Sequence, residues 1–268
     1  MPHAIVRLPA PSLASDCALT HIARTPIDFA RIAAQHAAYR EALRAAGCVL
    51  DVLPALPAFP DSVFVEDAAV ALPGRVVLTR PGTPSREPEP RFLCDTLAGH
   101  GLEIAQIEPP ATLDGGDVLR IGRRLYVGAS SRTNPAGIAA IAEWAWRDSL
   151  EVVAVPIGPS LHLKTAVTAL EDDTVVANPA WVDPTAFAVA RVIEVDPQEP
   201  FAANVLRIDT TLLVNRAFPR TLERLEAHAR SGGLRVMPVD IAEFGKAEAG
   251  LTCLSLILES GDQPAKGL

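Results

Sequence analysis

Five residues that could bind or activate a polar substrate recur at intervals of roughly 40 to 50 residues along this chain. They are two acids, an imidazole, an amide and a thiol: Asp67, Asp114, His162, Asn204 and Cys253. Each opens a stretch that we interpret as the first strand of a hairpin. If the hairpins are equivalent units of a closed ring, these side chains converge on its axis and share one pocket. The competing interpretation is coincidental spacing.

Cys253 and His162 are the pair that could carry out nucleophilic catalysis. A cysteine attacks as its thiolate, which a neighbouring imidazolium or a cationic substrate stabilises. The histidine could then protonate a leaving group and take a proton from water, and Asp114 could orient the imidazole by accepting its ring N–H. Taken singly, these residues also fit structural roles, since a lone cysteine or histidine in an apolar stretch is usually core and Gly115-Gly116 suits a turn.

A second group of charged residues could bind a substrate that carries a planar cation and a carboxylate. Asp61, Glu66 and Asp67 are interleaved with apolar residues, and burying such carboxylates is costly unless they meet a cation such as a guanidinium. Arg86 and Arg132 could form a fork for a carboxylate. The alternatives are a solvated acidic edge and two solvated arginines.

The elements that must position these residues form a repeat of hairpin, helix and strand. The expected hairpins span residues 63–79, 112–128, 161–177 and 203–215. Helices are expected at 29–47, 135–149 and 219–232, and single strands at 48–53, 102–107, 151–155 and 234–239. The last unit has only strand 251–259, read as an apolar strand with Cys253 at its mouth. Strand 3–8 could supply its partner by closing the ring, and the polar loop 11–26 is long enough to be a lid.

Composition narrows the possible partners and location. With 268 residues and 49% hydrophobic content, the chain can bury a sizeable core. Its formal charge of -8 argues against nucleic acid or an anionic membrane as a partner. The four cysteines have neither metal-ligand spacing nor the pattern of a disulfide framework. Without a secretory signal or a run of ~20 apolar residues, a cytoplasmic location is expected.

Several motifs together resemble the dimethylarginine dimethylaminohydrolase family of the guanidine-modifying, or pentein, superfamily. They run in family order over nearly the whole chain, and jointly they are specific although each is weak alone. The matching stretches are residues 61–67 (DSVFVED), 79–86 (TRPGTPSR), 111–119 (ATLDGGDVL), 131–134 (SRTN), 161–164 (LHLK) and 251–253 (LTC).

The resemblance implies an α/β fold, a five-bladed propeller of ββαβ units in a single domain over residues 1–268. It also implies hydrolysis of Nω-methylated arginine to citrulline and a methylamine. Cys253 would attack the guanidinium carbon, His162 would protonate the departing amine and later activate water, and Asp114 would orient the histidine. The residues that would bind the substrate are Leu19, Asp61, Glu66, Asp67, Arg86, Arg132 and Ala247.

Other interpretations stay open at this point. An arginine deiminase-type enzyme of the same superfamily would release ammonia from unmodified arginine, and a ring-shaped binding module would not turn over at all. The ligand is expected to be a small molecule, with no metal, no cofactor, no nucleic acid and no membrane involved. A homodimer is compatible with the sequence, which does not decide the oligomeric state.

Overall fold

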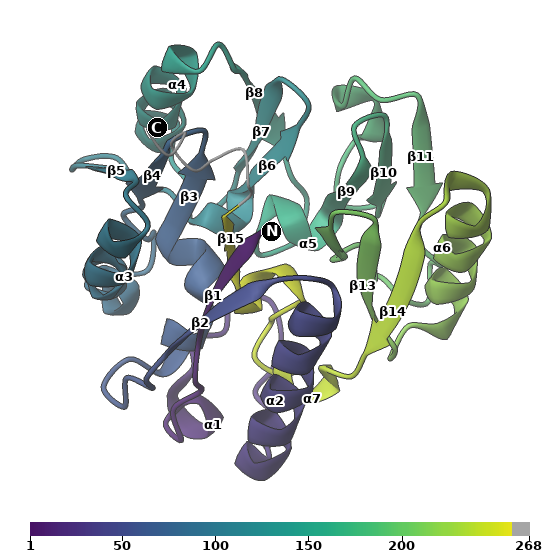
Figure 1. Cartoon of the computed structure of the whole chain (residues 1–268), viewed down its shortest axis with the longest axis horizontal. Coiled ribbons are helices and arrows are strands. Elements are labelled where there is room, and N and C mark those ends of the chain that lie inside the picture. Colours follow the sequence, from purple (N-terminus) through teal and green to yellow (C-terminus); the bar gives the residue numbers. More distant parts are fainter. Residues whose placement is uncertain (259–268) are drawn as a thin grey trace.

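Each of the five sheets in residues 1–258, the part of the chain that the computed structural model describes, has three strands arranged in the same way (Figure 1). A first strand pairs antiparallel with a second, which pairs parallel with a third. The first sheet contains β3 (Ala69–Leu72), β4 (Arg75–Leu78) and β5 (Glu103–Gln106), and the second contains β6 (Val118–Ile121), β7 (Arg124–Ala129) and β8 (Glu151–Pro156). The third contains β9 (Val167–Glu171), β10 (Thr174–Ala177) and β11 (Arg191–Glu194), and the fourth contains β12 (Leu206–Ile208), β13 (Thr211–Asn215) and β14 (Arg235–Val239). The fifth contains β15 (Leu256–Leu258), β1 (His3–Arg7) and β2 (Val49–Leu53).

The fifth sheet joins the two ends of the described chain. β1 pairs antiparallel with β15, with His3 opposite Leu258 and Ile5 opposite Leu256. The predicted closure by the N-terminal strand is therefore confirmed. The last residue of the predicted strand, Glu259, lies outside the described residues.

The helices of the described chain lie mainly on the outside of the sheets (Figure 1). Their limits are α1 (Leu13–Asp16), α2 (Phe29–Ala45), α3 (Cys94–Gly99), α4 (Pro135–Arg147), α5 (Leu163–Ala166), α6 (Pro219–Gly232) and α7 (Ala242–Gly245). α2 and α4 begin where the side chains of Asp28 and Asn134 accept backbone N–H groups of the first turn. α6 ends at Gly233, whose φ of 70° suits the left-handed turn at a helix end. The expected helices at 29–47, 135–149 and 219–232 are thus present.

The third unit departs from the expected repeat. Between β10 and β11 the described chain has only a short 3-10 turn, η6 (Pro184–Ala186), where the second and fourth units have the helices α4 and α6. Strand β11 had no counterpart among the sequence predictions. The other 3-10 segments are η1 (Pro60–Val63), η2 (Val65–Ala68), η3 (Pro84–Arg86), η4 (Glu89–Leu93), η5 (Gly115–Asp117) and η7 (Thr252–Leu254).

The first strand of each unit is shorter than predicted, because the chain forms a helical turn or an irregular segment before it. The expected strands 63–72, 112–121 and 161–170 contain the turns η2, η5 and α5, and only their later parts, β3, β6 and β9, form strands. Residues 203–205 likewise precede β12. Cys253 therefore lies on the turn η7, and the prediction that it stands in a strand is wrong in this detail. The polar residues of these segments bond to one another across units, which gives the backbone an alternative to sheet pairing.

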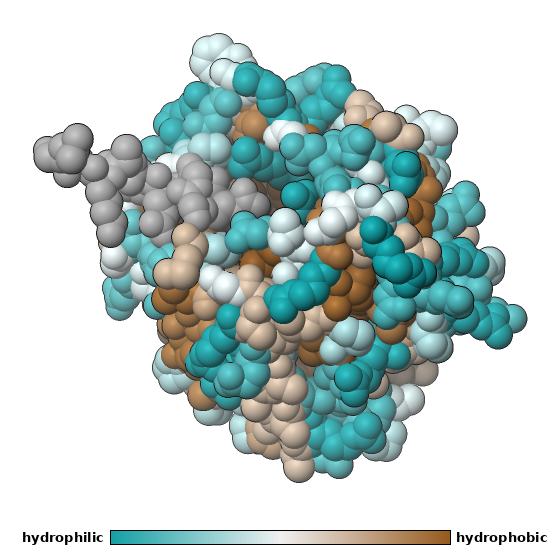
Figure 2. Space-filling model, turned by 45° about the vertical axis from the view of Figure 1, so that its right-hand side comes forward, coloured by the Kyte–Doolittle hydropathy of each residue, from teal (hydrophilic) through white to brown (hydrophobic). Residues whose placement is uncertain are grey.

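The molecule has an apolar interior and a surface on which hydrophilic residues are interspersed with hydrophobic ones (Figure 2). One cluster packs α2 against the segments around Cys253, and others fill the space between neighbouring sheets. The first strands of all five sheets also contribute residues to one central cavity of about 660 Å³. Within residues 1–258, the helices are all too short or too polar to cross a bilayer.

Candidate active site

The segments that precede β3, β9 and β15 bring Asp67, His162 and Cys253 to one small cavity, which we call the catalytic cavity. Its volume is about 20 Å³. Both members of the predicted nucleophile and base pair line it. Its lining residues are Ala18, Asp61, Phe64, Asp67, Arg86, Arg132, Leu161, His162, Ala247, Glu248, Ala249 and Cys253.

His162 is held between two carboxylates. Its Nε2 lies 2.9 Å from Asp114 Oδ2 and its Nδ1 lies 3.7 Å from Asp67 Oδ1. Burial opposes the charge of the imidazolium, but the carboxylates of Asp67, Asp114 and Asp117 outweigh it and raise the pKa of His162 to about 9. The histidine is therefore protonated at neutral pH and can donate a proton.

Asp117 fixes the histidine through the backbone, a role that the sequence did not suggest. Its Oδ1 accepts the N–H of Leu163 at 2.9 Å, and its Oδ2 accepts the hydroxyls of Ser130 and Thr133. The side chain is fully buried. The second aspartate of the DGGD stretch thus anchors the start of α5.

Gly116 provides the space that the imidazole needs. A Cβ built on Gly116 would lie 2.7 Å from both Asp67 Oδ1 and His162 Nδ1. Its N–H also donates to Asp67 Oδ1 at 3.1 Å. This glycine is required by close packing at the site, in addition to the turn that the sequence predicted.

The thiol of Cys253 accepts the backbone N–H of Gly250 at 3.4 Å. Burial raises the pKa of this thiol, and the charges of Glu66 and Asp67 raise it further, against the weaker opposing effects of Gly250 and Lys164. The group is therefore a thiol in the unliganded protein at neutral pH. A cation bound in the catalytic cavity would favour the thiolate.

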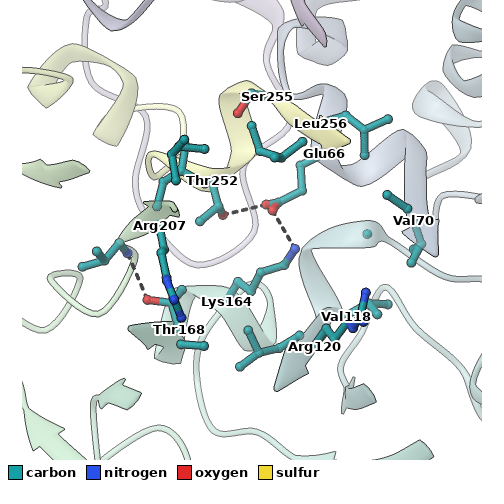
Figure 3. Close-up of a pocket in the computed structure, with 18 of the residues that line it drawn as sticks. Glu66, Val70, Val118, Arg120, Lys164, Thr168, Arg207, Thr252, Ser255 and Leu256 are labelled. Atoms are coloured by element: carbon teal, nitrogen blue, oxygen red, sulfur yellow. Dashed lines mark hydrogen bonds and ion pairs between the residues drawn. The ribbon is translucent and has the colours of Figure 1, made fainter. Parts of the chain in front are cut away.

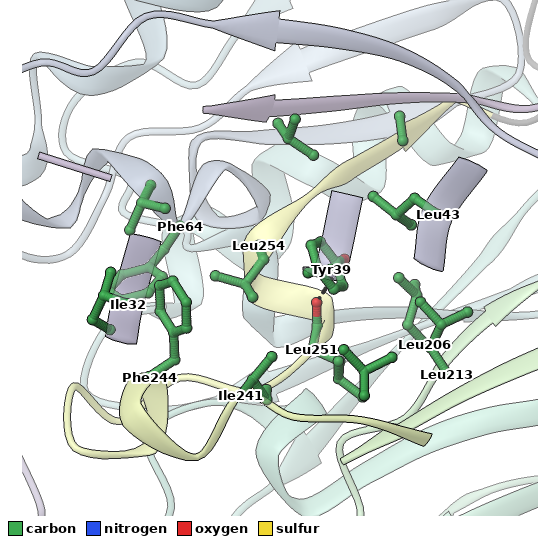
Figure 4. Close-up of a cluster of buried hydrophobic side chains, with 14 of the residues drawn as sticks. Ile32, Tyr39, Leu43, Phe64, Leu206, Leu213, Ile241, Phe244, Leu251 and Leu254 are labelled. Atoms are coloured by element: carbon green, nitrogen blue, oxygen red, sulfur yellow. Dashed lines mark hydrogen bonds between the residues drawn. The ribbon is translucent and has the colours of Figure 1, made fainter. Parts of the chain in front are cut away.

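The turn that carries Cys253 is held by hydrogen bonds from two sides. On the apolar side, the hydroxyl of Tyr39 on α2 donates to Leu251 O at 2.9 Å and lies 2.7 Å from Ser255 Oγ (Figure 4). On the polar side, Asn204 accepts the N–H of Thr252 and donates to its hydroxyl, both at 3.0 Å. The nucleophile therefore stands on a turn fixed at both ends.

Two of the three predicted cation-binding acids line the catalytic cavity. Asp61 accepts the N–H of Ala18 at 3.1 Å, and burial raises the pKa of its carboxyl. The pKa of Asp67 is lowered: burial opposes its charge, but His162 and Arg86 more than compensate. A cation entering the catalytic cavity would meet both carboxylates.

Glu66, the third predicted acid, is among the residues that line the central cavity. Its Oε1 lies 2.6 Å from Lys164 Nζ, and its Oε2 accepts the hydroxyl of Thr252 at 2.7 Å (Figure 3). Burial raises the pKa of Glu66, while Lys164 and Thr252 lower it. Glu66 is thus paired with a lysine and does not line the catalytic cavity. Neither Lys164 nor Thr252 had been assigned a role from the sequence.

The two arginines differ in how far their donors are already used. Arg86 donates to Asp67 at 2.6 Å, to Glu89 through two nitrogens, and to the carbonyls of Asp61 and Phe64. Burial lowers its pKa, but these carboxylates raise it well above the usual range.

Arg132 instead donates to hydroxyls, those of Thr83 and Thr20, and lies 3.8 Å from Asp114. Neutral hydroxyls are easier to displace than carboxylates, because charge-assisted bonds are the stronger ones. Arg132 is therefore the arginine that is freer to accept a new anion.

The loop 17–26 closes over the catalytic cavity. Glu248 accepts the N–H groups of Thr20, His21 and Ile22 at 2.7, 2.5 and 2.8 Å. A cavity of about 20 Å³ has room for about one water molecule, so a larger ligand requires its lining, to which this loop contributes Ala18, to move. Glu248 was missed from the sequence, because its partners lie more than 220 residues away.

The remaining predicted residues are Leu19 and Ala247. Ala247 is buried and lines the catalytic cavity. Leu19 packs against the apolar cluster beside α2, and it is the neighbouring Ala18 that reaches the cavity.

Asp67, Asp114 and His162 are also close enough to hold a metal ion together. Such an ion would displace the proton of His162.

Comparisons with known proteins identify the family of the chain. The arginine deiminase family model matches residues 54–224. The N(G),N(G)-dimethylarginine dimethylaminohydrolase of Streptomyces coelicolor is 42% identical over 95% of this chain and 96% of its own length. The enzyme of the same name from Pseudomonas aeruginosa is 33% identical over 95% of this chain and 98% of its own length. A structure of the Pseudomonas aeruginosa protein in complex with citrulline has a TM-score of 0.87 at 30% identity, covering 96% of this chain and 98% of that one.

Proposed function

The chain belongs to the dimethylarginine dimethylaminohydrolase family of the pentein superfamily, and we propose from this premise that it hydrolyses Nω-methylated L-arginine to L-citrulline and a methylamine. The observation that carries the proposal is the catalytic cavity itself. Cys253 and His162 line it together with the carboxylates of Asp61 and Asp67. A nucleophile, a proton donor and a cation-binding surface therefore meet in one place.

Opposite charges at the two ends of the substrate would orient it in the catalytic cavity. Asp61 and Asp67 would receive the guanidinium, and Arg132, whose present partners are hydroxyls, would bind the carboxylate. Arg86 would act mainly by holding Asp67, because its donors are already bonded inside the protein. Ala247 and the loop around Leu19 would enclose the amino acid end. Glu66 would act on the nucleophile through Thr252 and not by direct contact.

The first half of the reaction forms a covalent intermediate. The guanidinium offsets the acidic field that keeps Cys253 protonated, so the thiol gives up its proton as Sγ bonds to the guanidinium carbon. This proton passes through solvent to the departing amine, which therefore ends as an ammonium cation. His162, already protonated, gives its proton to the departing nitrogen as the C–N bond breaks. Dimethylamine leaves and a thiouronium remains on Cys253. Asp114 holds the imidazole in place throughout.

The second half releases citrulline. Water adds to the same carbon while His162 accepts its proton, and the C–S bond then breaks. The oxygen of water becomes the ureido oxygen of citrulline, the thiol regains a proton, and the amine ends as its cation. This sequence needs neither an oxidant nor a further co-reactant.

The fold and chain organisation support the same proposal. We propose that the five sheets are the blades of a propeller within one domain, because their first strands all line the central cavity. We propose separately that the ligand of the catalytic cavity is a small molecule. Whether two copies associate is a separate question, for which sedimentation of the purified protein is the direct test.

The test is citrulline formation from three substrates: asymmetric dimethylarginine, monomethylarginine and arginine. Turnover of the methylated substrates supports the proposal. Turnover of arginine alone would instead indicate a deiminase, the activity named by the matching family model. No citrulline from any of the three would indicate a binding module.

The covalent step is tested by mass spectrometry of enzyme quenched with substrate. We expect an adduct on Cys253 that is absent from Cys253→Ser, and Cys94→Ser serves as the matched control because Cys94 lies on α3, outside the catalytic cavity. Full citrulline formation by Cys253→Ser would refute the covalent route.

A further inference from the structure

Two imidazoles and a carboxylate meet outside the catalytic cavity, near the N-terminus. His3 is on β1, Asp51 is on the neighbouring β2, and His100 follows α3. Asp51 Oδ2 lies 2.9 Å from His100 Nε2 and 3.8 Å from His3 Nδ1. The two rings stand edge to face with centroids 4.9 Å apart. One nitrogen from each histidine and one oxygen of the carboxylate all lie within 4.8 Å of one another.

One atom of this cluster lacks the partner that its burial requires. His3 Nδ1 is buried and has no hydrogen-bond partner among the described residues. Its distance of 3.8 Å to the carboxylate is too long for a hydrogen bond. A buried polar atom without a partner costs free energy, and its usual explanation is an ion or a water molecule bound at that point.

We propose that His3, Asp51 and His100 form a binding site for a divalent transition-metal ion, with Zn²⁺ as the best match. Tetrahedral zinc takes imidazole nitrogen and carboxylate oxygen at about 2.0–2.2 Å, which places neighbouring ligand atoms about 3.4 Å apart. The observed separations of 2.9 and 3.8 Å lie on either side of that value. Magnesium and calcium fit less well, because they prefer oxygen ligands throughout.

The site is accessible to an ion from solution. The side chains of His3, Asp51 and His100 are 28%, 35% and 12% exposed, so water can complete the coordination. The three ligands come from elements of two units: β1 and β2 belong to the sheet that joins the chain ends, and α3 belongs to the unit of β3, β4 and β5. A bound ion would therefore connect these two units. It would stabilise the folded state in proportion to its affinity.

This inference is independent of the proposed function, and its test must exclude the catalytic residues as metal ligands. The starting protein is the untagged, chelator-treated chain with Cys253→Ser and His162→Ala, which removes the thiol and disrupts the cluster of Asp67, Asp114 and His162. Zn²⁺ binding is measured by calorimetry, and Co²⁺ binding by visible absorption. We expect one ion per chain and a tetrahedral Co²⁺ spectrum.

The decisive variants are His100→Ala and Asp51→Asn in that background. Each should weaken Zn²⁺ binding at least ~100-fold, since even residues that only support a ligand are worth about 10- to 100-fold. The matched control is His228→Ala. His228 lies 2.9 Å from Glu171, the same contact that His100 makes with Asp51, but it belongs to no three-ligand group within residues 1–258.

Thermal unfolding provides the second measurement. Zn²⁺ should raise the Tm of the background protein and of His228→Ala, but not that of His100→Ala or Asp51→Asn. The proposal is overturned if the background protein binds no zinc, or if the affinity and the Tm shift are the same in all four proteins. Should His100→Ala fail to fold, Asp51→Asn decides the question, because it preserves the size of the side chain.

Discussion

Replacing Glu248 with alanine should release the loop that closes the catalytic cavity. The carboxylate accepts three consecutive backbone N–H groups of this loop at 2.5–2.8 Å. Further bonds attach the same loop: Ala18 N–H donates to Asp61, Arg132 donates to the hydroxyl of Thr20, and Lys246 donates to Pro26 O. Only the three bonds to Glu248 are lost in Glu248→Ala, so the open form should gain population without loss of the fold.

The size of the effect follows from those three bonds. A hydrogen bond to a charged group contributes about 1.5–3 kcal/mol, but two of these bonds are solvent-exposed and the third is only part-buried, so about 0.7 kcal/mol each is a more suitable value. The total is about 2 kcal/mol. Since 1.4 kcal/mol corresponds to a tenfold change, the ratio of open to closed loop should rise about 30-fold.

Limited trypsin digestion measures this ratio directly. Arg24 is exposed within the loop but donates to Cys17 O, so cleavage after it requires the loop to open. The cleavage rate follows the open population when opening is fast relative to cleavage. It should rise about 30-fold in Glu248→Ala and by less in Glu248→Gln, which keeps one oxygen acceptor. Equal cleavage rates in Glu248→Ala and in the control Glu223→Ala, an exposed change on α6, would refute the reasoning.

Three further predictions concern the centre of the site. In Gly116→Ala the new Cβ would meet Asp67 and His162 at 2.7 Å, so kcat should fall at least ~100-fold with a native circular dichroism spectrum, and unchanged kcat would contradict the geometry. His162 has a pKa of about 9 in the fold against an ordinary value of 6.5, so its contribution to the free energy of unfolding is complete below pH 6.5 and is lost as the pH rises to 9. Urea unfolding should show about 3 kcal/mol less difference between wild type and His162→Gln at the higher pH, whereas a constant difference would argue against the shift. Lys164→Met leaves Glu66 buried without its cation and should cost about 3 kcal/mol in unfolding free energy, and adding Glu66→Gln should restore most of it; additive losses would show that the pair is not coupled.

Much of the fold could be predicted because periodic apolar strands and glycine turns are local signals. The turns at Gly74 and Gly122 have φ values of 74° and 55°, and each joins two antiparallel strands as expected. The closure by β1 was also predictable, since the last unit lacked a second strand. The 3-10 turns before the first strands were not, because an apolar run with polar residues suits either conformation until its partners are known.

The residues of the candidate active site could likewise be predicted only in part. Residues that recur at the unit spacing could be gathered on the axis from the sequence, and Asp67, His162 and Cys253 do line one cavity. The residues that hold these side chains in place could not be found from the unit spacing. Lys164, Glu248 and Asp117 act through partners about 45 to 230 residues away, and no local pattern records such pairs. Asn204 shows the limit of the method, since it was expected to share the pocket but supports Thr252 and does not line the catalytic cavity.

The acidic surroundings of Cys253 make the reactivity of the thiol depend on its ligand. Burial together with Glu66 and Asp67 disfavours the thiolate, and the cavity of about 20 Å³ is too small for a ligand much larger than water. A guanidinium that enters must first open the loop and then neutralise Asp67, which removes one of the causes that hold the proton on sulfur. The same charge that binds the substrate therefore activates the nucleophile. A neutral electrophile of equal size should alkylate Cys253 more slowly than a cationic amidine, and the ratio of the two rates should fall when Asp67 is changed to asparagine.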